Sequence, residues 1–198
     1  MKRVYVLLFS LLPIIIVSCG KNDNGGGIQK VEGFGQNNPE VPDAVSYDLN
    51  ADSVDDFQID YGMGVWDGID ASGLFISGDL KSLDDSTVLV RNNEDLSVQI
   101  LFNRPQDTIW SAPKQPDKWN DDGSVTIAEI TQAADGIWPD EWTVNSEFNS
   151  NPYYLGIRVK ENEDFLVGWI KLEINKTNGK IKFEQYRLTA DEYIVIPE

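Results

Sequence analysis

Short apolar runs alternate with polar turn residues along most of the chain after residue 43. The runs are rich in β-branched and aromatic residues, and Gly, Asp and Asn separate them at intervals of about ten residues, which is typical of an antiparallel sandwich or barrel. We therefore expect residues 44–198 to form an all-β fold, an antiparallel, jelly-roll-like β-sandwich. The predicted strands are Ala44–Leu49, Asp56–Tyr61, Gly73–Gly78, Thr87–Arg91, Ser97–Phe102, Thr108–Trp110, Tyr153–Lys160, Phe165–Asn175, Lys180–Leu188 and Tyr193–Ile196.

The pair Asn178-Gly179 lies between two of these predicted strands. Asn-Gly suits a two-residue type I′ turn, because both central residues of that turn need positive φ angles. Before the pair, Ile170, Leu172 and Ile174 alternate with polar residues. We expect a tight hairpin whose alternate apolar side chains share one face.

One short helix is predicted inside a long loop that runs from Ser111 to Asn151. Thr126 and Glu129 have the spacing of a capping box, in which the two side chains satisfy backbone N–H groups at a helix start. Residues 127–134 favour a helix, and Gly136 is suited to end it in the left-handed conformation. The expected architecture is thus a sandwich with a single helix at one edge.

Residues 1–18 have the parts of a secretory signal peptide. Lys2 and Arg3 form a positive segment, and an apolar run follows from Val4 to Val17. The run has only about 14 residues and contains Pro13, so it is too short to span ~30 Å of hydrocarbon comfortably. We expect the segment to direct export and then to be removed.

The end of this segment, Ile16-Val17-Ser18-Cys19, resembles the lipobox of bacterial lipoproteins. The resemblance implies that Cys19 is diacylated, that the chain is cleaved before it, and that the new amino group is acylated, as by palmitate. An ordinary signal peptide with a cysteine near its end is the alternative, but the single cysteine of the chain lies where the lipobox requires one. Acyl chains contribute about 0.8 kcal/mol per buried methylene, so two or three of them anchor a protein firmly to a membrane.

Residues 19–43 are expected to form a flexible tether, because they are rich in Gly, Asn and Pro and lack a sustained apolar period. Gly20 differs from the Asp that resembles an inner-membrane retention signal, so the outer membrane is the expected location. Lys21-Asn22-Asp23 resembles in part the surface-export signal of Bacteroidetes lipoproteins. The periplasmic and the extracellular face both stay open.

Two further segments, Tyr154–Arg158 and Gly168–Leu172, resemble a paired-strand signature of uncharacterised secreted β proteins. Those proteins carry a strand of the form Tyr-Leu-Gly-apolar-Arg, followed by a strand of the form Gly-Trp-apolar-basic-apolar. The resemblance implies a secreted β domain. It implies no activity, because none is established for the proteins that carry the signature.

Composition excludes several classes of function. The 198 residues include 16 Lys plus Arg and 33 Asp plus Glu, for a formal net charge of -17, which argues against a nucleic-acid partner. The chain has no His, so Ser-His and Cys-His catalysis and His metal sites are excluded. We expect a protein with a binding or structural role, held at the membrane by its lipid, and not an enzyme.

The stretch Asp48–Phe57 alternates oxygen-bearing side chains with other residues. Calcium takes six to eight oxygen ligands, and a tight loop can aim alternate side chains and one carbonyl at the ion. The stretch resembles the calcium loops of thrombospondin type 3 repeats and integrin-like FG-GAP repeats, which implies one structural Ca²⁺. The predicted ligands are the side chains of Asp48, Asn50, Asp52 and Asp56 and the backbone oxygen of Val54.

Ser53 stands where those calcium loops carry a glycine, usually with a positive φ angle. A serine in that conformation costs about 1 kcal/mol relative to glycine, which weakens or abolishes the site. The alternative is an acidic turn between strands, stabilised by the side chains of Asp and Asn. Dependence of the fold on calcium separates the two hypotheses.

Tryptophans gather in the 110–142 region, and three of them, Trp119, Trp138 and Trp142, are candidates for stacking on sugar rings. A glycan-binding module is therefore the second hypothesis, although large aromatic residues most often pack in a core. A carboxylate-dependent glycosidase is the third hypothesis, since such enzymes need only two acids. Asp140 and Glu141, between two of these tryptophans, are the pair to inspect.

Overall fold

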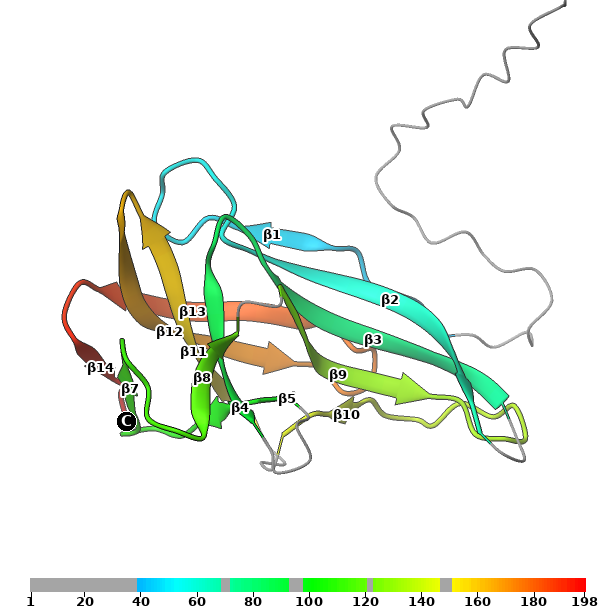
Figure 1. Cartoon of the computed structure of the whole chain (residues 1–198). Helices are drawn as coiled ribbons and strands as arrows, with labels where there is room; N and C mark the ends of the chain where they lie inside the picture. Colours follow the sequence, from blue (N-terminus) through cyan, green and yellow to red (C-terminus); the bar gives the residue numbers. More distant parts are fainter. Residues whose placement is uncertain (1–38, 69–71, 93–97, 121–122, 147–150) are drawn as a thin grey trace, which may run out of the picture. The chain divides into compact units, whose positions relative to one another are not determined.

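The computed structural model describes residues 39–68, 72–92, 98–120, 123–146 and 151–198. In this part of the chain every regular element is a β-strand, and the strands pair antiparallel in three sheets (Figure 1). The expected all-β sandwich of packed antiparallel sheets is confirmed. Cys19 and most of the predicted tether lie outside the described residues.

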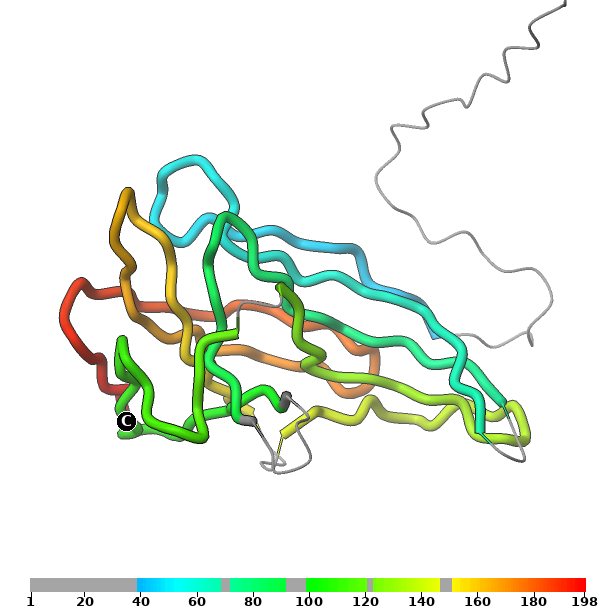
Figure 2. The backbone as a smooth tube through the Cα atoms, viewed as in Figure 1, coloured from blue at the N-terminus to red at the C-terminus, as the bar shows by residue number. Residues whose placement is uncertain are grey.

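A five-stranded sheet forms one layer of the sandwich. The strands at its two edges are short, and it is assembled from two parts of the chain that are separated by strands of the other layer (Figure 2). In spatial order its strands are β1 (Val45–Tyr47), β2 (Phe57–Asp67), β3 (Ser72–Ser82), β9 (Ser124–Thr131) and β10 (Thr143–Val144).

A seven-stranded sheet forms the other layer, and a two-stranded sheet accompanies it. The main path of the larger sheet is β13 (Ile181–Thr189), β12 (Asp164–Ile174), β11 (Tyr153–Glu161), β4 (Thr87–Asn92) and β5 (Val98–Ile100). Beside this path, β6 (Phe102–Asn103) pairs with β11, and β8 (Asp117–Asn120) pairs with β4. The small sheet consists of β7 (Thr108–Trp110) and β14 (Tyr193–Val195).

The main core lies between the two large sheets, because alternate residues of each strand point to the same side. In β2, Phe57 and Ile59 are fully buried, whereas the residues between and after them are partly exposed. In β12, Ile170, Leu172 and Ile174 all reach the core, so the predicted shared face is confirmed.

A second apolar cluster lies on the opposite face of the seven-stranded sheet. Leu89, Tyr154 and Trp169 face outward from that sheet and pack with Ile109 of β7 and Ile194 of β14. The seven-stranded sheet is therefore buried on both faces where the two-stranded sheet covers it. This explains why its strands contain nearly continuous apolar runs, as sheets covered on both sides do.

The predicted helix over residues 127–134 is wrong, because residues 124–131 form β9, a strand paired with β3. The pairing passes from Gly78↔Ala128 to Asp79↔Thr126, so Ile127 is the extra residue of a bulge. A bulge shifts the alternation of buried positions, and the apolar spacing then imitates that of a helix. Thr126 caps nothing, since its hydroxyl donates to Asp79 Oδ1 at 2.7 Å.

The hairpin between β12 and β13 exists, but its turn is not type I′. Only Gly179 has a positive φ angle, of 71°. The loop is longer than two residues, because Asn175 N–H donates to the Lys180 carbonyl and Gly179 N–H donates to the Asn175 carbonyl. It therefore matches the longer hairpin loops that are built around ordinary turns.

Trp142 holds this hairpin loop against the five-stranded sheet. Its side chain is 2% exposed, its backbone N–H donates to the Lys176 carbonyl at 2.7 Å, and its ring lies on Gly179. Tyr61 of β2 contacts the Trp142 ring edge-on, accepts a hydrogen bond from Ile181 N–H at 2.9 Å and donates to the Gly179 carbonyl at 3.3 Å. The loop is thus tied to the other layer by packing and by hydrogen bonds.

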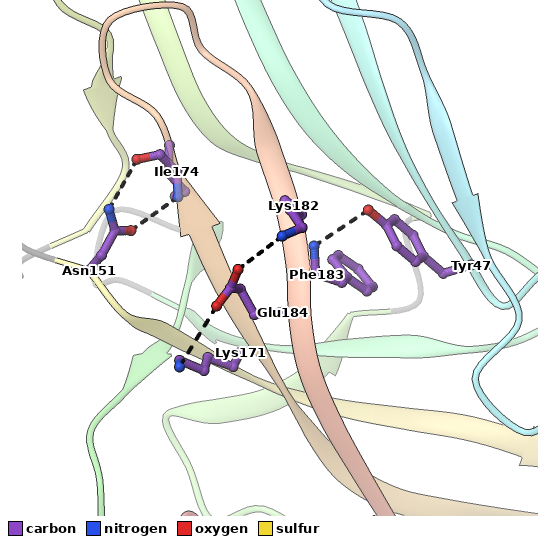
Figure 3. A network of polar contacts seen from close by, with 7 residues as sticks. All are labelled: Tyr47, Asn151, Lys171, Ile174, Lys182, Phe183 and Glu184. Atoms are coloured by element: carbon purple, nitrogen blue, oxygen red, sulfur yellow. Dashed lines mark hydrogen bonds and ion pairs between the residues drawn. The ribbon is translucent and has the colours of Figure 1, made fainter.

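The edge strands β1 and β13 form a second connection between the layers (Figure 3). The Tyr47 ring stacks on the Phe183 ring with centroids 3.8 Å apart, and the Tyr47 hydroxyl accepts a hydrogen bond from Phe183 N–H. Beside it, the Glu184 carboxylate lies between the ammonium groups of Lys171 and Lys182, and Lys182 lowers the pKa of that carboxyl.

We predict that Gly179→Ala destabilises the protein more than Gly136→Ala does. Both glycines have positive φ angles, so each substitution costs about 1–2 kcal/mol in backbone strain. A Cβ at Gly179 would also lie 2.2 Å from the Trp142 ring, whereas nothing lies within 4 Å at Gly136, so we add about 1–3 kcal/mol of overpacking for Gly179 alone. Urea unfolding of the two variants measures the difference. Equal losses would contradict the role of the Trp142 contact.

Candidate functional site

The predicted calcium loop, residues 48–56, connects β1 to β2 and approaches the turn between β11 and β12 (Figure 2). Leu49 anchors the loop in the main core. Val54, whose carbonyl is one of the predicted ligands, has an exposed side chain. The loop is therefore held at its ends.

The acceptor oxygens of the loop bind its own backbone. Asp48 accepts from Ala51 N–H at 2.7 Å through one carboxylate oxygen and from Ser53 N–H at 2.9 Å through the other. Asp52 accepts from Val54 N–H at 2.8 Å. Ala51 and Ser53 have φ angles of 62° and 74°, so Ser53 adopts the left-handed conformation that glycine provides in the calcium loops that this stretch resembles.

Asp56 ends the loop and points into the protein, with 1% of the residue exposed. Its carboxylate accepts from Leu49 N–H at 2.7 Å and from the Ser86 hydroxyl at 3.2 Å. Burial raises the pKa of this carboxyl above its usual range, although the two hydrogen bonds act in the opposite direction. Asp56 thus closes the loop and connects it to the turn before β4.

The loop also contacts the seven-stranded sheet through Asn50, whose side-chain amide donates to the Lys160 carbonyl at 2.9 Å. The Lys160 ammonium in turn lies 2.5 Å from the Asp85 carboxylate. The Lys160 ammonium lowers the pKa of the Asp85 carboxyl, and the Asp85 carboxylate raises the pKa of Lys160. The loop is therefore joined by polar contacts to two turns of the neighbouring sheet.

The five predicted calcium ligands all lie in this loop, but they do not share one centre. Among the residues that the structure describes, no three His, Cys, Asp or Glu side chains are grouped so that they could hold a metal ion. The carboxylates of Asp48 and Asp52 face loop amides, and that of Asp56 faces Ser86 and Leu49. Calcium binding requires these groups to turn toward a common point.

A pocket of about 350 Å³ lies beside the loop, at the lower end of the size range of small-molecule sites. Arg158 lines it, and the guanidinium lies 4.2 Å from the centroid of the Phe165 ring and 5.4 Å from that of Trp119. Within the described part of the chain, the buried hydroxyl of Thr87 has no hydrogen-bond partner. The lining suits water or a small polar molecule.

The three tryptophans proposed as a sugar platform do not come together. Trp142 belongs to the main core, and Trp119, 9% exposed, belongs to the second cluster on the far side of the seven-stranded sheet. Trp138 packs partly buried against the main core. Trp119 and Trp142 are buried and Trp138 is partly buried, so the structure does not bring the three rings together on one surface. Asp140 and Glu141 are exposed in the connection between β9 and β10.

Several aromatic residues outside the predicted site residues lie wholly or partly at the surface. Trp110 is 43% exposed on β7, where its ring lies 4.9 Å from that of Tyr193 on β14. Trp66 and Phe75, each only partly exposed, lie on the face of the five-stranded sheet that points away from the core, each over a glycine of the adjacent strand. The glycines inside these strands, Gly64 and Gly73, are visible in the sequence, but the register that places them under the rings comes from the structure.

Comparison with known proteins found no matching family model, no matching curated protein and no matching solved structure. A search of the described residues for a helix long and apolar enough to cross a membrane also found none.

Proposed function

We propose that the protein is a lipid-anchored β-sandwich of the bacterial outer membrane with a binding or structural role, and that it is not an enzyme. The observation that carries the proposal is the segment Ile16-Val17-Ser18-Cys19, which places the single cysteine of the chain at the lipobox position. The first strand begins at Val45, immediately after the tether predicted from sequence. This spacing suits a domain that hangs from an acylated Cys19.

The charge of the protein supports anchoring by lipid alone. A formal net charge of -17 gives little attraction to anionic headgroups, so the acyl chains have to supply the affinity for the membrane.

We also propose that calcium binds the acidic loop and stabilises it. The positive φ angle of Ser53 supports this idea, because the backbone already has the left-handed turn that calcium loops of this spacing use. Binding would draw Asp48 and Asp52 from the loop amides to the ion, while the Val54 carbonyl and the Asn50 side chain add neutral oxygens. Since the loop connects two strands of one layer and contacts turns of the other layer, calcium would strengthen the connection between them.

We predict that Cys19→Ala abolishes membrane association, because the acyl chains provide the anchor. In a Gram-negative host, the full chain is labelled with a clickable palmitate analogue and then followed through membrane fractionation. Ser18→Ala is the matched control, since it keeps a small residue before the cysteine, and it is expected to stay labelled and membrane-bound. Labelled, membrane-bound Cys19→Ala protein would contradict the lipoprotein proposal.

We predict that calcium raises the thermal midpoint of the full chain in detergent above its value in EDTA. At about 2 mM calcium, a site of ~0.2 mM affinity adds about 1.4 kcal/mol, or roughly 3 °C. Asp52→Ala should remove the increase, whereas Asp55→Ala, an exposed residue outside the predicted ligand set, should retain it. Identical melting curves with calcium, magnesium and EDTA would show that the loop is only an acidic turn.

A further inference from the structure

The outer face of the five-stranded sheet differs from the two faces of the seven-stranded sheet, which carry the two apolar clusters. The side chains of Asp60 and Trp66 in β2 and of Phe75 and Ser77 in β3 point away from the main core. Among the described residues, the apolar clusters include none of these four side chains. The two-stranded sheet covers the seven-stranded sheet instead. This face therefore offers a flat surface formed by β2, β3 and β9.

Trp66 lies flat on this surface. It pairs across the hairpin with Gly73, and a Cβ at Gly73 would lie 2.6 Å from the indole nitrogen of Trp66. The indole N–H reaches past β3 and donates to the Gln132 carbonyl at 3.1 Å. One face of the ring rests on the strand, and the hydrogen bond fixes its orientation, so the ring is preorganised.

Phe75 lies in the neighbouring row of the same face. Its ring crosses from β3 onto β2, whereas the Trp66 ring crosses from β2 onto β3. It pairs with Gly64 of β2, and a Cβ at Gly64 would lie 2.4 Å from the Phe75 ring. Two rows of one sheet face are about 7 Å apart. The two glycines thus allow two rings to lie along the sheet in neighbouring rows.

Polar groups continue the surface beyond the rings. Asp79 accepts from the Ser77 hydroxyl at 3.0 Å and from the Thr126 hydroxyl at 2.7 Å, which fixes its carboxylate on this face. Glu129 of β9 pairs directly with Ser77 and is partly exposed. The surface therefore combines flat aromatic rings with oriented carboxylate and hydroxyl oxygens.

The charge of the surface restricts its ligand. Among the described residues of β1, β2, β3, β9 and β10, Lys81 is the only cation, and it is paired with Asp60. A phosphate, a sulfate or a uronate would meet uncompensated carboxylates here. An uncharged sugar would not be repelled by these carboxylates. Its hydroxyls can donate hydrogen bonds to them, and its C–H faces can pack on the aromatic rings as other apolar surface does.

We infer that the outer face of the five-stranded sheet binds an uncharged glycan, with Trp66 and Phe75 as the stacking platform and Glu129 and Asp79 as acceptors for its hydroxyls. The inference gives a ligand class to the binding role proposed above. The tests of Cys19 and of calcium do not involve this face, so its failure would leave those proposals unaffected.

The experiment is a calorimetric titration of the full chain in detergent with uncharged gluco-, xylo-, manno- and chito-oligosaccharides. Polygalacturonate and spermine serve as the anionic and cationic probes. We expect at least one uncharged oligosaccharide to bind with a submillimolar Kd that changes less than twofold between about 50 and 500 mM NaCl, because screening does not act on a neutral ligand.

Trp66→Ala should weaken that binding at least tenfold, equivalent to about 1.4 kcal/mol, and Trp66→Phe should restore part of it. Trp110→Ala is the matched control, since Trp110 is an exposed tryptophan on a different sheet, and its Kd should stay within twofold. Thermal midpoints of all variants separate lost binding from lost fold.

Three outcomes would overturn the inference. The first is that no uncharged oligosaccharide binds at millimolar concentration. The second is that Trp66→Ala combined with Phe75→Ala folds and keeps full affinity. The third is that only spermine binds and that salt abolishes its binding, which would make the face a site for cations. In the first case the rings serve only to cover their glycines, as aromatic residues do in some sheets.

Discussion

Burial of the seven-stranded sheet on both faces organises the rest of the molecule. Its central strands carry apolar side chains on each side, so exposing either side to water would be unfavourable. The five-stranded sheet covers one side, and the small β7–β14 sheet covers part of the other. Because both covering layers pack on this sheet, neither apolar cluster lies on the far face of the five-stranded sheet.

The need to cover both faces of this sheet also explains where three of the tryptophans lie. Trp142, Trp119 and Trp169 are buried where layers meet, and Trp142 also fixes the loop of the β12–β13 hairpin through Gly179. Their large apolar area stabilises the contacts between layers. Trp66, in contrast, lies on a glycine and holds its indole N–H on a backbone carbonyl. A ring in that position lies outside the two apolar clusters and is partly exposed.

The acidic loop has a structural position that suits its proposed role. It connects the first two strands of one layer, yet Asp56 and Asn50 bind groups that belong to turns of the other layer. A change in the loop, such as the binding of calcium, would therefore act on the contact between the layers. The polar pocket around Arg158 lies against the same turns, so the loop and the pocket would respond together.

The sequence was sufficient for the strands whose alternation is regular. Thr108–Trp110 forms a strand with the predicted bounds, and Tyr153–Lys160 is one residue shorter than the strand observed. It failed at β9, because the bulge at Ile127 breaks the alternation and leaves a helix-like spacing. For Trp119 and Trp142 the sequence left a core role and a surface role both open, since residue type alone does not distinguish a core ring from a surface ring. The pairing of Trp66 with Gly73 depends on strand register, which a single sequence does not specify.

The most direct test of the account is fluorine NMR of the full chain with fluorinated tryptophan, in the presence of an uncharged oligosaccharide. The six tryptophans give separate resonances, which single substitutions to phenylalanine assign. The account predicts that the Trp66 resonance shifts on titration while those of Trp119 and Trp142 do not. A shift at Trp110 without one at Trp66, or no shift at any tryptophan, would contradict the assignment of this face as the ligand-binding surface.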